Sequence, residues 1–353
     1  MLGWTSTRWV VGFAVTKIVY IISAGHSGST LLDLIVGTLP NTFSTGELTY
    51  LPWQLYRCMN TRLGAERSRQ ELCSCQSRFD VCPVWKDVLS RVSVRVGFNI
   101  YDKPFRFKIS LLADQRYTGN DHSIRAVWGR VQRAAYWLSI NRPLLRPMAN
   151  VLTRAYSRPC RNNLLLADAI GDSQHAGWVV DSSKSIFRLR LLHSAAPERV
   201  RAVLLWRDPR GVAASAKKLG GDPLVTAAGW TRIYQRALQW ACRRAPSICW
   251  PVAYEDICSD AVAVRTQVAR FLRLPSPESS LEIVTTQNHL VAGNVLRHKG
   301  PINIRADRTW QAVLTPAEAA LVQEITSPVL EKLRQQKQRA EQEALQEELA
   351  CSM

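Results

Sequence analysis

The stretch KIVYIISAGHSGSTLLDLIVGTL, residues Lys17–Leu39, carries the strongest structural signal in the chain. It opens with a largely apolar run, Lys17–Ser23, that is rich in β-branched residues, which is typical of a buried parallel strand. A turn rich in glycine and serine follows, and then an apolar segment with the pattern of a helix. The order strand, tight turn and helix predicts a backbone cradle for an anion.

The turn has the composition that such a cradle needs. Its two glycines, Gly25 and Gly28, would let the backbone approach a ligand and take positive φ angles. The amides at the start of the helix, with the helix dipole, would point toward a phosphate. The candidate binding residues are Gly25, His26, Ser27, Gly28, Ser29 and Thr30, and three of them add hydroxyl donors. A turn of this composition that binds no ligand is the alternative.

The turn differs from the phosphate loop of nucleotide triphosphatases, G-x-x-x-x-G-K-[ST]. When the two are aligned on Gly28, Ser23 replaces the first glycine and Ser29 replaces the lysine that reaches the β- and γ-phosphates. The absence of this lysine disfavours a kinase or an ATPase. The turn is therefore predicted to bind an anion other than a γ-phosphate.

Three more apolar runs, Trp178–Ser183, Arg199–Trp206 and Ile248–Tyr254, are predicted to be strands. Pro251 in the last of them favours an edge position or a bulge. Helical patterns separate the strands; they cover Ser185–Ala195, Pro209–Leu219, Ala227–Arg244 and Ala261–Leu272. This alternation predicts an α/β fold with a P-loop-like central parallel sheet of about five strands and helices on both faces.

The length and composition agree with this fold class. The chain has 353 residues, of which 46% are hydrophobic and 21% charged, so a disordered chain, a collagen and a coiled-coil rod are excluded. The 46 Lys and Arg against 28 Asp and Glu give a formal charge of +18. Such a charge favours a polyanionic partner, which could be a nucleic acid, an anionic membrane surface or a highly charged nucleotide.

One region breaks the alternation of strands and helices. Residues 98–160 carry 11 Lys and Arg against 3 Asp and have no strand-like run, so they are predicted to form a basic helical insertion. We favour a solvated face for this insertion over a lid or a surface for an acidic acceptor. The insertion lies within a predicted domain over residues 17–330, which a leader over 1–16 precedes. A charged helical tail over 331–353 follows the domain and is expected to be exposed.

The N-terminal residues give a weak signal for localisation. No apolar run reaches the roughly 20 residues that a membrane span needs, because Arg8 and Lys17 interrupt the N-terminal stretch 1–25. Nine cysteines in a chain of this size do not form a dense disulfide framework, so a reducing compartment is expected. The prediction is a cytoplasmic protein, with an N-terminal membrane anchor or peripheral membrane contact as alternatives.

A second motif, RDPRGVAAS, starts with Arg207 directly after a predicted strand. Open parallel sheets bind ligands at the carboxyl ends of their strands, which is where Arg207 would lie. Pro209 suits the first turn of a helix, and Ser215 follows Arg207 by eight residues, or roughly two helical turns. An arginine and a hydroxyl placed in this way can hold one phosphate together. A surface pair between Arg207 and Asp208 is the alternative.

Together, the two motifs resemble those of sulfotransferases that use 3′-phosphoadenosine 5′-phosphosulfate (PAPS). GHSGSTLL resembles the family motif for the 5′-phosphosulfate, and RDPRGVAAS resembles the motif for the 3′-phosphate. The resemblance runs from about residue 17 to 316 and leaves the basic insertion unmatched. Its further landmarks are GEL at Gly46–Leu48, VDSSK at Val180–Lys184, YEDI at Tyr254–Ile257, ARFLRLP at Ala269–Pro275 and the loop Gly293–Trp310.

The resemblance implies roles for several residues. Arg207 and Ser215 would bind the 3′-phosphate, and Arg297 and Lys299 of the C-terminal loop would assist. His298 separates these two residues, whereas cytosolic members have a contiguous Arg-Lys-Gly. Many members have Arg or Lys where this chain has His26. A histidine is only partly charged near neutral pH, so Lys184 is expected to supply the permanent cation at the leaving group.

Sulfuryl transfer also needs a base for the proton of the acceptor hydroxyl. In GEL, Glu47 occupies the position of the glutamate base in tyrosylprotein sulfotransferases and follows His26 by 21 residues. A helix-capping role after Thr45 is the alternative, and His289 is the reserve base. The catalytic candidates are therefore Glu47, His26 and Lys184.

The cysteines Cys73, Cys75 and Cys82 form the pattern C-x-C-x₆-C. Three thiols raise the possibility of zinc, for which Cys58 is the candidate fourth ligand. A redox pair or buried thiols is the favoured interpretation, and the resemblance implies no metal. Similar trios occur in bacterial members of the family, which indicates a structural role.

The predicted activity is transfer of a sulfuryl group from PAPS to an acceptor hydroxyl, which releases adenosine 3′,5′-bisphosphate. The expected acceptor is a small molecule or a glycan; a lipid-linked sugar, a phenol and a peptide tyrosine stay open, and so does the oligomeric state. A nucleotide kinase of the same fold is one rival. The other is a nucleic-acid-binding protein that uses the basic insertion, which is disfavoured because no recognised nucleic-acid motif accompanies it.

Overall fold

The computed structural model describes residues 15–60, 72–110, 131, 134–135, 137–139, 142–154, 156–241 and 247–352. Most of the predicted leader, and with it the alternative of an N-terminal anchor, lies outside the described residues. Among the described residues, no helix combines the length and the apolar character needed to cross a bilayer.

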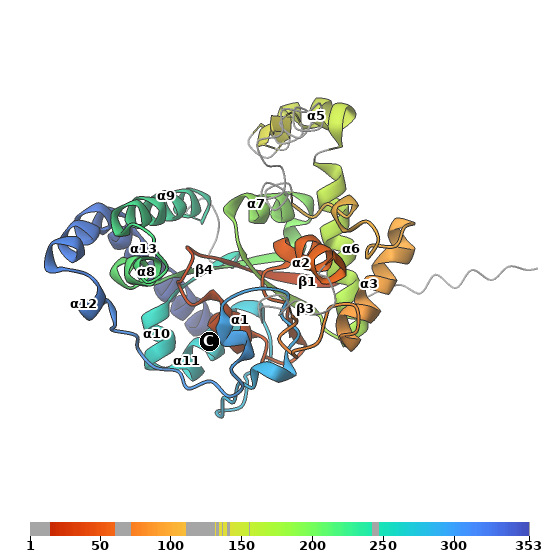
Figure 1. The fold of residues 1–353 in the computed structure, drawn as a ribbon. Coiled ribbons are helices and arrows are strands. Elements are labelled where there is room, and N and C mark those ends of the chain that lie inside the picture. The colour runs from red at the N-terminus through yellow and green to blue at the C-terminus, as the bar shows by residue number, and fades with distance from the viewer. Residues whose placement is uncertain are drawn as a thin grey trace, which may run out of the picture.

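The centre of the molecule is a five-stranded sheet with the order β2-β3-β1-β4-β5 (Figure 1). Its strands are β1 (Lys17–Ile22), β2 (Thr42–Ser44), β3 (Trp178–Lys184), β4 (Val200–Trp206) and β5 (Cys249–Ala253). Every neighbouring pair is parallel. The predicted α/β fold with a parallel sheet of about five strands is therefore confirmed.

The two edges of the sheet explain two features of the sequence. β5 carries Pro251 and pairs only with β4 among the strands of the sheet, so the edge position expected for a proline in a strand is confirmed. β2 forms the other edge and was not predicted. It has three residues, in which Thr42 pairs with Trp178, and so short a segment shows no alternation that a sequence pattern could reveal.

Helices cover both faces of the sheet. They are α1 (Ser29–Val36), α2 (Leu51–Asn60), α3 (Pro83–Val96), α5 (Arg146–Thr153), α6 (Ser157–Gln174), α7 (Ile186–Ala195), α8 (Pro209–Lys217), α9 (Pro223–Ala241), α10 (Tyr254–Ser259), α11 (Ala261–Leu272), α12 (Trp310–Val313) and α13 (Pro316–Ser352). Single 3₁₀ turns occur at 48–50, 104–106, 143–145, 197–199, 285–287 and 295–298. The four predicted helical segments correspond to α7, α8, α9 and α11.

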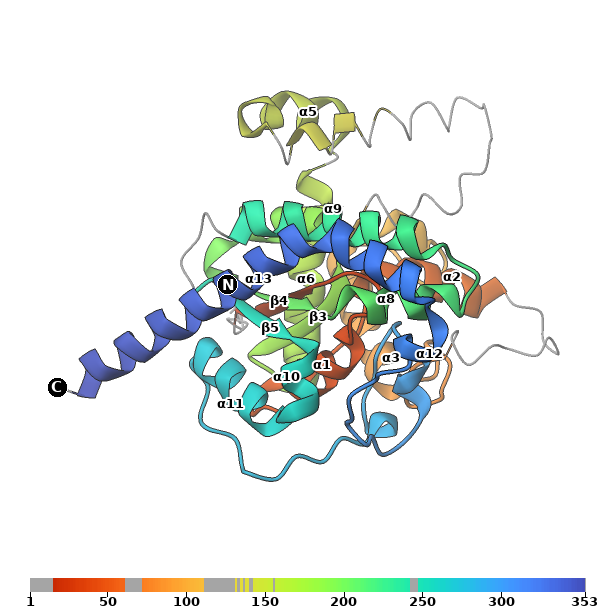
Figure 2. The same ribbon diagram turned by 90° about the vertical axis from the view of Figure 1, so that its left-hand side faces the viewer.

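Alternate residues of β1 enter two separate cores. Ile18, Tyr20 and Ile22 pack with side chains of α7, α9 and α13. Val19 and Ile21 point to the other face, where α1 and α11 cover the sheet. Figures 1 and 2 show the sheet enclosed between these two layers of helices. Since both faces are buried, the strand is a continuous apolar run, as the sequence indicated.

A third core lies beside the β3 side of the sheet. It is built by α2, α3 and α6 together with the segment between α2 and α3, and Phe79 and Trp85 are fully buried in it. Val291 and Ala292 from the C-terminal half of the chain join the same core. This third core therefore connects segments that are remote in sequence, and it encloses Cys73 and Cys82.

The described part of residues 98–160 contains helical segments and no named strand, as predicted. Helix α5 stands out from the rest of the molecule in both views (Figures 1 and 2). Leu144, Met148 and Val151, in and beside this helix, are exposed. Of the 11 basic residues counted in the insertion, those between 111 and 130 and Arg133 lie outside the described residues.

The C-terminal tail differs from the prediction of an exposed segment. Helix α13 spans 37 residues and begins at Pro316, well before the predicted start. Leu333 and Ala340 on this helix are fully buried, and Lys337 forms an ion pair with Asp256 at 2.7 Å. The helix packs against α9 and β5 (Figure 2), and most of its other described residues after 330 are exposed, so the tail is attached to the core along one face.

Candidate functional site

The cradle forms where β1 ends and α1 begins. Gly28 is the N-cap of α1 with a φ of 86°, as predicted for this glycine. A side chain at Gly28 would also collide with Tyr254, because a Cβ atom there would lie 2.4 Å from the Tyr254 ring. Gly25 does not have a positive φ, so that expectation is wrong; His26 takes the left-handed conformation instead, at 61°. A histidine in this region is strained, which is common at functional sites.

The hydroxyls of the cradle are buried and partly engaged. The Ser27 hydroxyl lies 3.3 Å from the hydroxyl of Tyr234, which also accepts a hydrogen bond from the amide of Ala24. Thr30 Oγ1 accepts a hydrogen bond from the amide of Asn294 at 3.0 Å. Ser29 is buried at the first position of α1. The Thr30 contact attaches the C-terminal loop to the cradle.

Arg207 lies beside the cradle, at the carboxyl end of β4. Its guanidinium donates to the carbonyl of His26 at 3.2 Å and to Asp307 at 2.9 Å, and it stacks over the ring of Tyr254. The alternative of a surface pair with Asp208 is wrong, because Asp208 pairs with Arg210 at 2.6 Å. Arg207 thus connects the cradle with the C-terminal loop while its side chain is only 8% exposed.

Helix α8 follows Arg207 closely. A Cβ atom at Gly211 would lie 2.9 Å from Arg207 Nε, so the glycine allows the helix and the guanidinium to pack together. Ser215 lies one turn further along and donates its hydroxyl to the carbonyl of Gly211 at 2.8 Å.

A cavity of about 510 Å³ opens beside Arg207. Tyr254, Asp307 and Arg308 are among the residues that line it, whereas Ser215 is not.

Glu47 and Lys184 form an ion pair next to the cradle. Lys184 is the last residue of β3 and has a φ of 68°, and Glu47 precedes the 3₁₀ turn at 48–50. Both side chains are largely buried: that of Lys184 is 20% exposed and that of Glu47 is 13% exposed. Two catalytic candidates that are 137 residues apart in sequence therefore meet at the carboxyl edge of the sheet.

The turn that carries Glu47 is held from three sides. Thr45 donates its amide and its hydroxyl to the carbonyl of Val180 on β3. The amide of Gly46 donates to the carboxyl of Asp33 on α1 at 3.1 Å. On the third side, the carbonyl of Ala292 accepts from the amide of Glu47 at 3.4 Å. These contacts fix the backbone of Glu47, although its side chain does not cap a helix.

Asp33 is a fully buried carboxyl beneath this turn. Burial raises its pKa to about 7, against the opposing effect of hydrogen bonds from its neighbours. The carboxyl of Asp33 is therefore partly protonated near neutral pH.

His26 faces two cations. Burial lowers the pKa of the imidazole, and the positive charges of Lys184 and Arg207 lower it further. His26 is accordingly neutral at pH 7, because its ordinary pKa is already near 6.5. The permanent positive charges beside the cradle are then those of Lys184 and Arg207, which agrees with the role expected for Lys184.

The two candidates in the C-terminal loop lie apart from the cavity beside Arg207. Arg297 is fully buried and donates to the carbonyls of Leu290 and Val291. Burial lowers its pKa to about 10, while nearby Cys73 and Glu47 act in the opposite direction. Lys299 is exposed. Asp307 and Arg308, a few residues further on, lie closer to Arg207, and no motif in the sequence singles them out.

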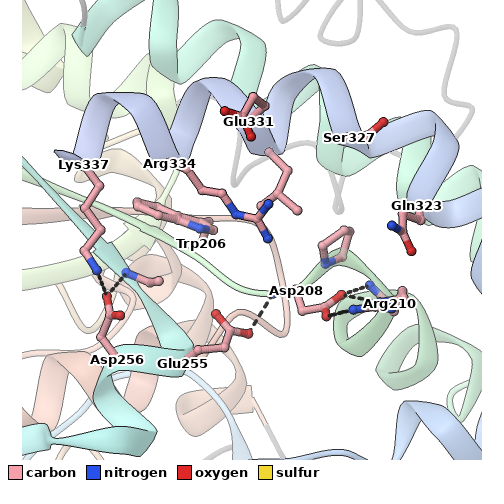
Figure 3. A pocket seen from close by; sticks show the side chains of 13 residues that line it. Trp206, Asp208, Arg210, Glu255, Asp256, Gln323, Ser327, Glu331, Arg334 and Lys337 are labelled. Carbon is pink, nitrogen blue, oxygen red and sulfur yellow. Dashed lines mark hydrogen bonds and ion pairs between the residues drawn. The ribbon is translucent and has the colours of Figure 1, made fainter. Parts of the chain in front are cut away.

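A second cavity, of about 450 Å³, lies on the other side of Asp208 (Figure 3). Trp206 and, from α13, Arg334 and Lys337 are among the residues that line it. The amide of Asp208 donates to Glu255 at 2.9 Å, and burial raises the pKa of this carboxyl. The two cavities share Asp208 and Glu255 as a common wall.

In the structure, His289 lies together with the three cysteines that the sequence analysis grouped. Cys73, Cys75, Cys82 and His289 place their ligand atoms within 4.8 Å of one another. His289, the reserve base, is thus next to thiols. Cys58, the candidate fourth ligand, instead bonds to Asp80 at 3.3 Å. No local sequence signal could have found His289, since 207 residues separate it from Cys82.

Comparison with known proteins gives a consistent picture. The sequence matches the model of a sulfotransferase family over residues 19–278. No curated protein matches the chain significantly.

Solved structures of sulfotransferases resemble it at low identity. The sulfotransferase domain from the curacin biosynthetic pathway aligns over 88% of this chain and 98% of its own, at 15% identity and a TM-score of 0.45. The sulfotransferase domain of the Synechococcus PCC 7002 olefin synthase aligns over 88% and 94%, at 15% identity and a TM-score of 0.43. Sulfotransferase STF1 from Mycobacterium tuberculosis H37Rv aligns over 90% and 78%, at 12% identity and a TM-score of 0.44.

Proposed function

The chain belongs to the sulfotransferase family, and from this premise we propose that it transfers a sulfuryl group from PAPS to the hydroxyl of an acceptor. The observation that carries the proposal is the meeting of three features at one edge of the sheet. They are the cradle with Gly28 at its helix start, Arg207 beside it, and the ion pair of Glu47 with Lys184.

The donor would occupy the cradle and the adjoining cavity. The amides from Gly25 to Thr30 would bind the 5′-phosphosulfate, because a helix start provides unpaired donors and a favourable dipole. Arg207 would bind the 3′-phosphate with a charge-assisted contact, assisted by Ser215 and Lys299. Arg297, which the family resemblance also implied, is fully buried and bonds to the carbonyls of Leu290 and Val291, so it is not proposed as a phosphate ligand. Tyr254, which stacks on Arg207 and packs on Gly28, keeps these two anion sites in a fixed relation.

In the transfer step, the acceptor oxygen forms a bond to sulfur while the bond from sulfur to the phosphate oxygen breaks. The carboxylate of Glu47 takes the proton of the acceptor hydroxyl. Negative charge develops on the leaving phosphate of adenosine 3′,5′-bisphosphate, and the ammonium of Lys184 stabilises it. A ring N–H of His26 can donate a hydrogen bond to the same phosphate. The protein mainly positions groups and stabilises charge, as in phosphoryl transfer.

The ion pair between Glu47 and Lys184 places the proposed base and the charge-stabilising ammonium on the same side of the cradle. The turn below Glu47 is bonded to β3, to α1 and to the C-terminal loop, so the carboxylate is held by rigid elements. This arrangement suits a single direct transfer between two bound substrates, because the groups for proton removal and for charge stabilisation are preorganised.

An acceptor screen with radiolabelled PAPS tests the proposed function. Small-molecule and glycan hydroxyls are the first acceptors to include, and the cytoplasmic location stays a prediction. Incorporation of label should require the bound donor and should fall by roughly 10²–10⁴ in kcat for Glu47→Gln, which keeps the shape but removes the base. The affinity for adenosine 3′,5′-bisphosphate should stay nearly unchanged in this variant.

Near-normal turnover of Glu47→Gln, with chemistry limiting the rate, would exclude Glu47 as the base. A loss of nucleotide affinity equal to the loss of turnover would instead assign Glu47 to the fold of the cradle.

A further inference from the structure

A cluster of soft metal ligands lies in the third core, apart from the transfer step. Cys73, Cys75 and Cys82 come from the segment between α2 and α3, and His289 comes from the segment that precedes the C-terminal loop. The sulfurs of Cys73 and Cys82 are fully enclosed, and the other two residues are half-buried. We propose that these four side chains bind one Zn²⁺ ion in a closed, structural site.

The distances between the four ligand atoms support the proposal. The sulfur of Cys82 lies 3.7 Å from that of Cys75 and 3.8 Å from that of Cys73. Nδ1 of His289 lies 3.2 Å from the sulfur of Cys82 and 3.7 Å from that of Cys73. Tetrahedral zinc with its usual bond lengths sets sulfur–sulfur edges of about 3.8 Å and sulfur–nitrogen edges of about 3.6 Å. Four of the six edges therefore match a zinc-sized tetrahedron, and the other two are no longer than 4.8 Å.

A disulfide does not account for this geometry. Two bonded sulfurs lie about 2.0 Å apart, whereas the sulfurs of Cys82 and its two neighbours are separated by 3.7 and 3.8 Å. A disulfide would also use two of the three thiols and leave His289 without a function in the cluster. Three thiolates and one imidazole are, in contrast, a recurring ligand set of structural zinc.

Local structure holds each ligand in place. Cys73 begins a tight turn in which its amide donates to Ser77 at 3.0 Å and its carbonyl accepts from Gln76 at 2.8 Å. Gln76 has a φ of 65°, which lets the chain reverse between Cys75 and Cys82. Cys82 is the N-cap of α3, so the start of this helix fixes its position.

The segment around His289 is also held in place by hydrogen bonds. Trp85 Nε1 donates to the carbonyl of His289 at 2.7 Å. The hydroxyl of Ser74 donates to the carbonyl of Asn288 and accepts from the amide of Leu290, at 2.5 and 2.8 Å. Such outer contacts around metal ligands set the orientation of the ligands. Ser74, which lies between two of the cysteines, thus connects the two halves of the proposed site.

Charge balance is consistent with the proposal. Three thiolates, a neutral imidazole and Zn²⁺ carry a net charge of −1 by simple addition, and a buried anion needs a compensating charge. Arg297 is a fully buried cation within electrostatic reach of Cys73. Its guanidinium is fixed by the carbonyls of Leu290 and Val291, which directly follow His289.

The proposed zinc ion would have a structural role and would take no part in the transfer reaction. Four protein ligands leave no open coordination site for a substrate. By joining residues 73–82 to the segment after His289, zinc would fix Val291 and Ala292, which bond to Thr45 and Glu47. If Glu47 is the base, as we propose, the zinc site positions the turn that carries it. This consequence rests on the proposed function, whereas the metal site itself does not.

Elemental analysis of the full chain, purified without chelators from medium that contains zinc, tests the proposal. The expected content is one zinc per chain. Cys75→Ser and His289→Asn should lower the content to well below half, and His289→Cys, which restores a zinc ligand, should recover it. Cys58→Ser is the matched control. It removes a neighbouring buried thiol that bonds to Asp80, and zinc content should not change.

Cobalt substitution of the wild-type chain gives a second readout that does not depend on any variant folding. Tetrahedral Co²⁺ with three thiolates should show intense visible d–d bands and a thiolate-to-metal charge-transfer band, and added zinc should abolish both. Folded wild-type chain that takes up neither zinc nor cobalt would overturn the proposal. So would a disulfide between two of the three cysteines in the freshly purified chain. Neither result depends on nucleotide binding, so the proposed function is tested separately.

Discussion

Arg207, the residue proposed to bind the 3′-phosphate, is paired with an acidic side chain in the structure. Its guanidinium pairs with Asp307 at 2.9 Å. Although burial acts in the opposite direction, hydrogen bonds from Thr309 and then the contact with Arg207 lower the pKa of the Asp307 carboxyl to about 2. An incoming 3′-phosphate would have to displace Asp307 or bind beside its negative charge. Asp307 therefore competes with the phosphate for the same guanidinium. Because of this competition, we expect that a substitution of Asp307 strengthens nucleotide binding.

We expect Asp307→Asn to bind adenosine 3′,5′-bisphosphate more tightly, by about 1 kcal/mol or roughly fivefold, because an anion beside the phosphate is removed. Arg207→Ala should act in the opposite direction and weaken binding by about 2–4 kcal/mol. Titration calorimetry measures both. Asp87→Asn, which breaks an exposed pair with Arg91, is the control and should change nothing. Weaker binding by Asp307→Asn would show that Asp307 organises the site.

Asp33 gives a prediction for stability against pH. Its pKa is about 7 in the folded chain, above the ordinary value of 3.8, so the folded state binds the extra proton between these values. The free energy of unfolding therefore falls as pH rises through this window. Asp33→Asn removes the effect, so its stability relative to wild type should increase by roughly 2–3 kcal/mol between about pH 5 and about pH 8. Urea unfolding of both chains at the two pH values measures this change; an equal difference at both would contradict it.

The sequence predicted individual residues where a motif surrounds them, and failed where the partner is remote. Glu47 and Lys184 were each selected by a local motif, and the structure brings them together. Their pairing could not be predicted, because it depends on which strands are neighbours. The same applies to Asp307 beside Arg207 and to His289 beside the cysteines. Each of these contacts joins segments that only the folded sheet and its loops bring close.

Among the elements, strands that are buried on both faces were the easiest to predict. β1, β3, β4 and β5 lie within two residues of their predicted bounds, because an apolar run flanked by turn residues has clear ends. β2 was missed since three residues have no period. Helix α13 was misjudged for a related reason. Its buried residues Leu333 and Ala340 are seven apart, two turns of a helix, within a strongly charged sequence.

Helix α13 allows a matched test of this correction. Leu333→Ala should lower the free energy of unfolding by about 2–4 kcal/mol, because a buried side chain is replaced by a cavity. Leu349→Ala is the same change on the same helix, but Leu349 is 60% exposed. This substitution should lower the free energy of unfolding by less than about 0.5 kcal/mol. Denaturant unfolding of the two variants measures the difference. Equal small effects would mean that the tail contributes little to the core.

The whole molecule carries a formal charge of +18, and the cradle lies among its positive groups. Lys184 and Arg207 are both near enough to His26 to lower its pKa. A site of this kind favours a small polyanion and raises its rate of association. The same charge would attract nucleic acid, but nucleic-acid binding falls steeply with salt. Helix α5, which projects from the layers, exposes apolar and not only basic side chains, so it does not form a purely basic surface.

Thermal unfolding with adenosine 3′,5′-bisphosphate and no divalent metal is the decisive measurement for a PAPS-dependent sulfotransferase. At a ligand concentration of 100 times Kd, the bisphosphate should stabilise the folded chain by about 2.7 kcal/mol. ATP with Mg²⁺ should stabilise it much less, because Ser29 replaces the lysine of the triphosphatase loop. Equal or greater stabilisation by ATP with Mg²⁺, or no stabilisation by the bisphosphate, would contradict the proposed donor.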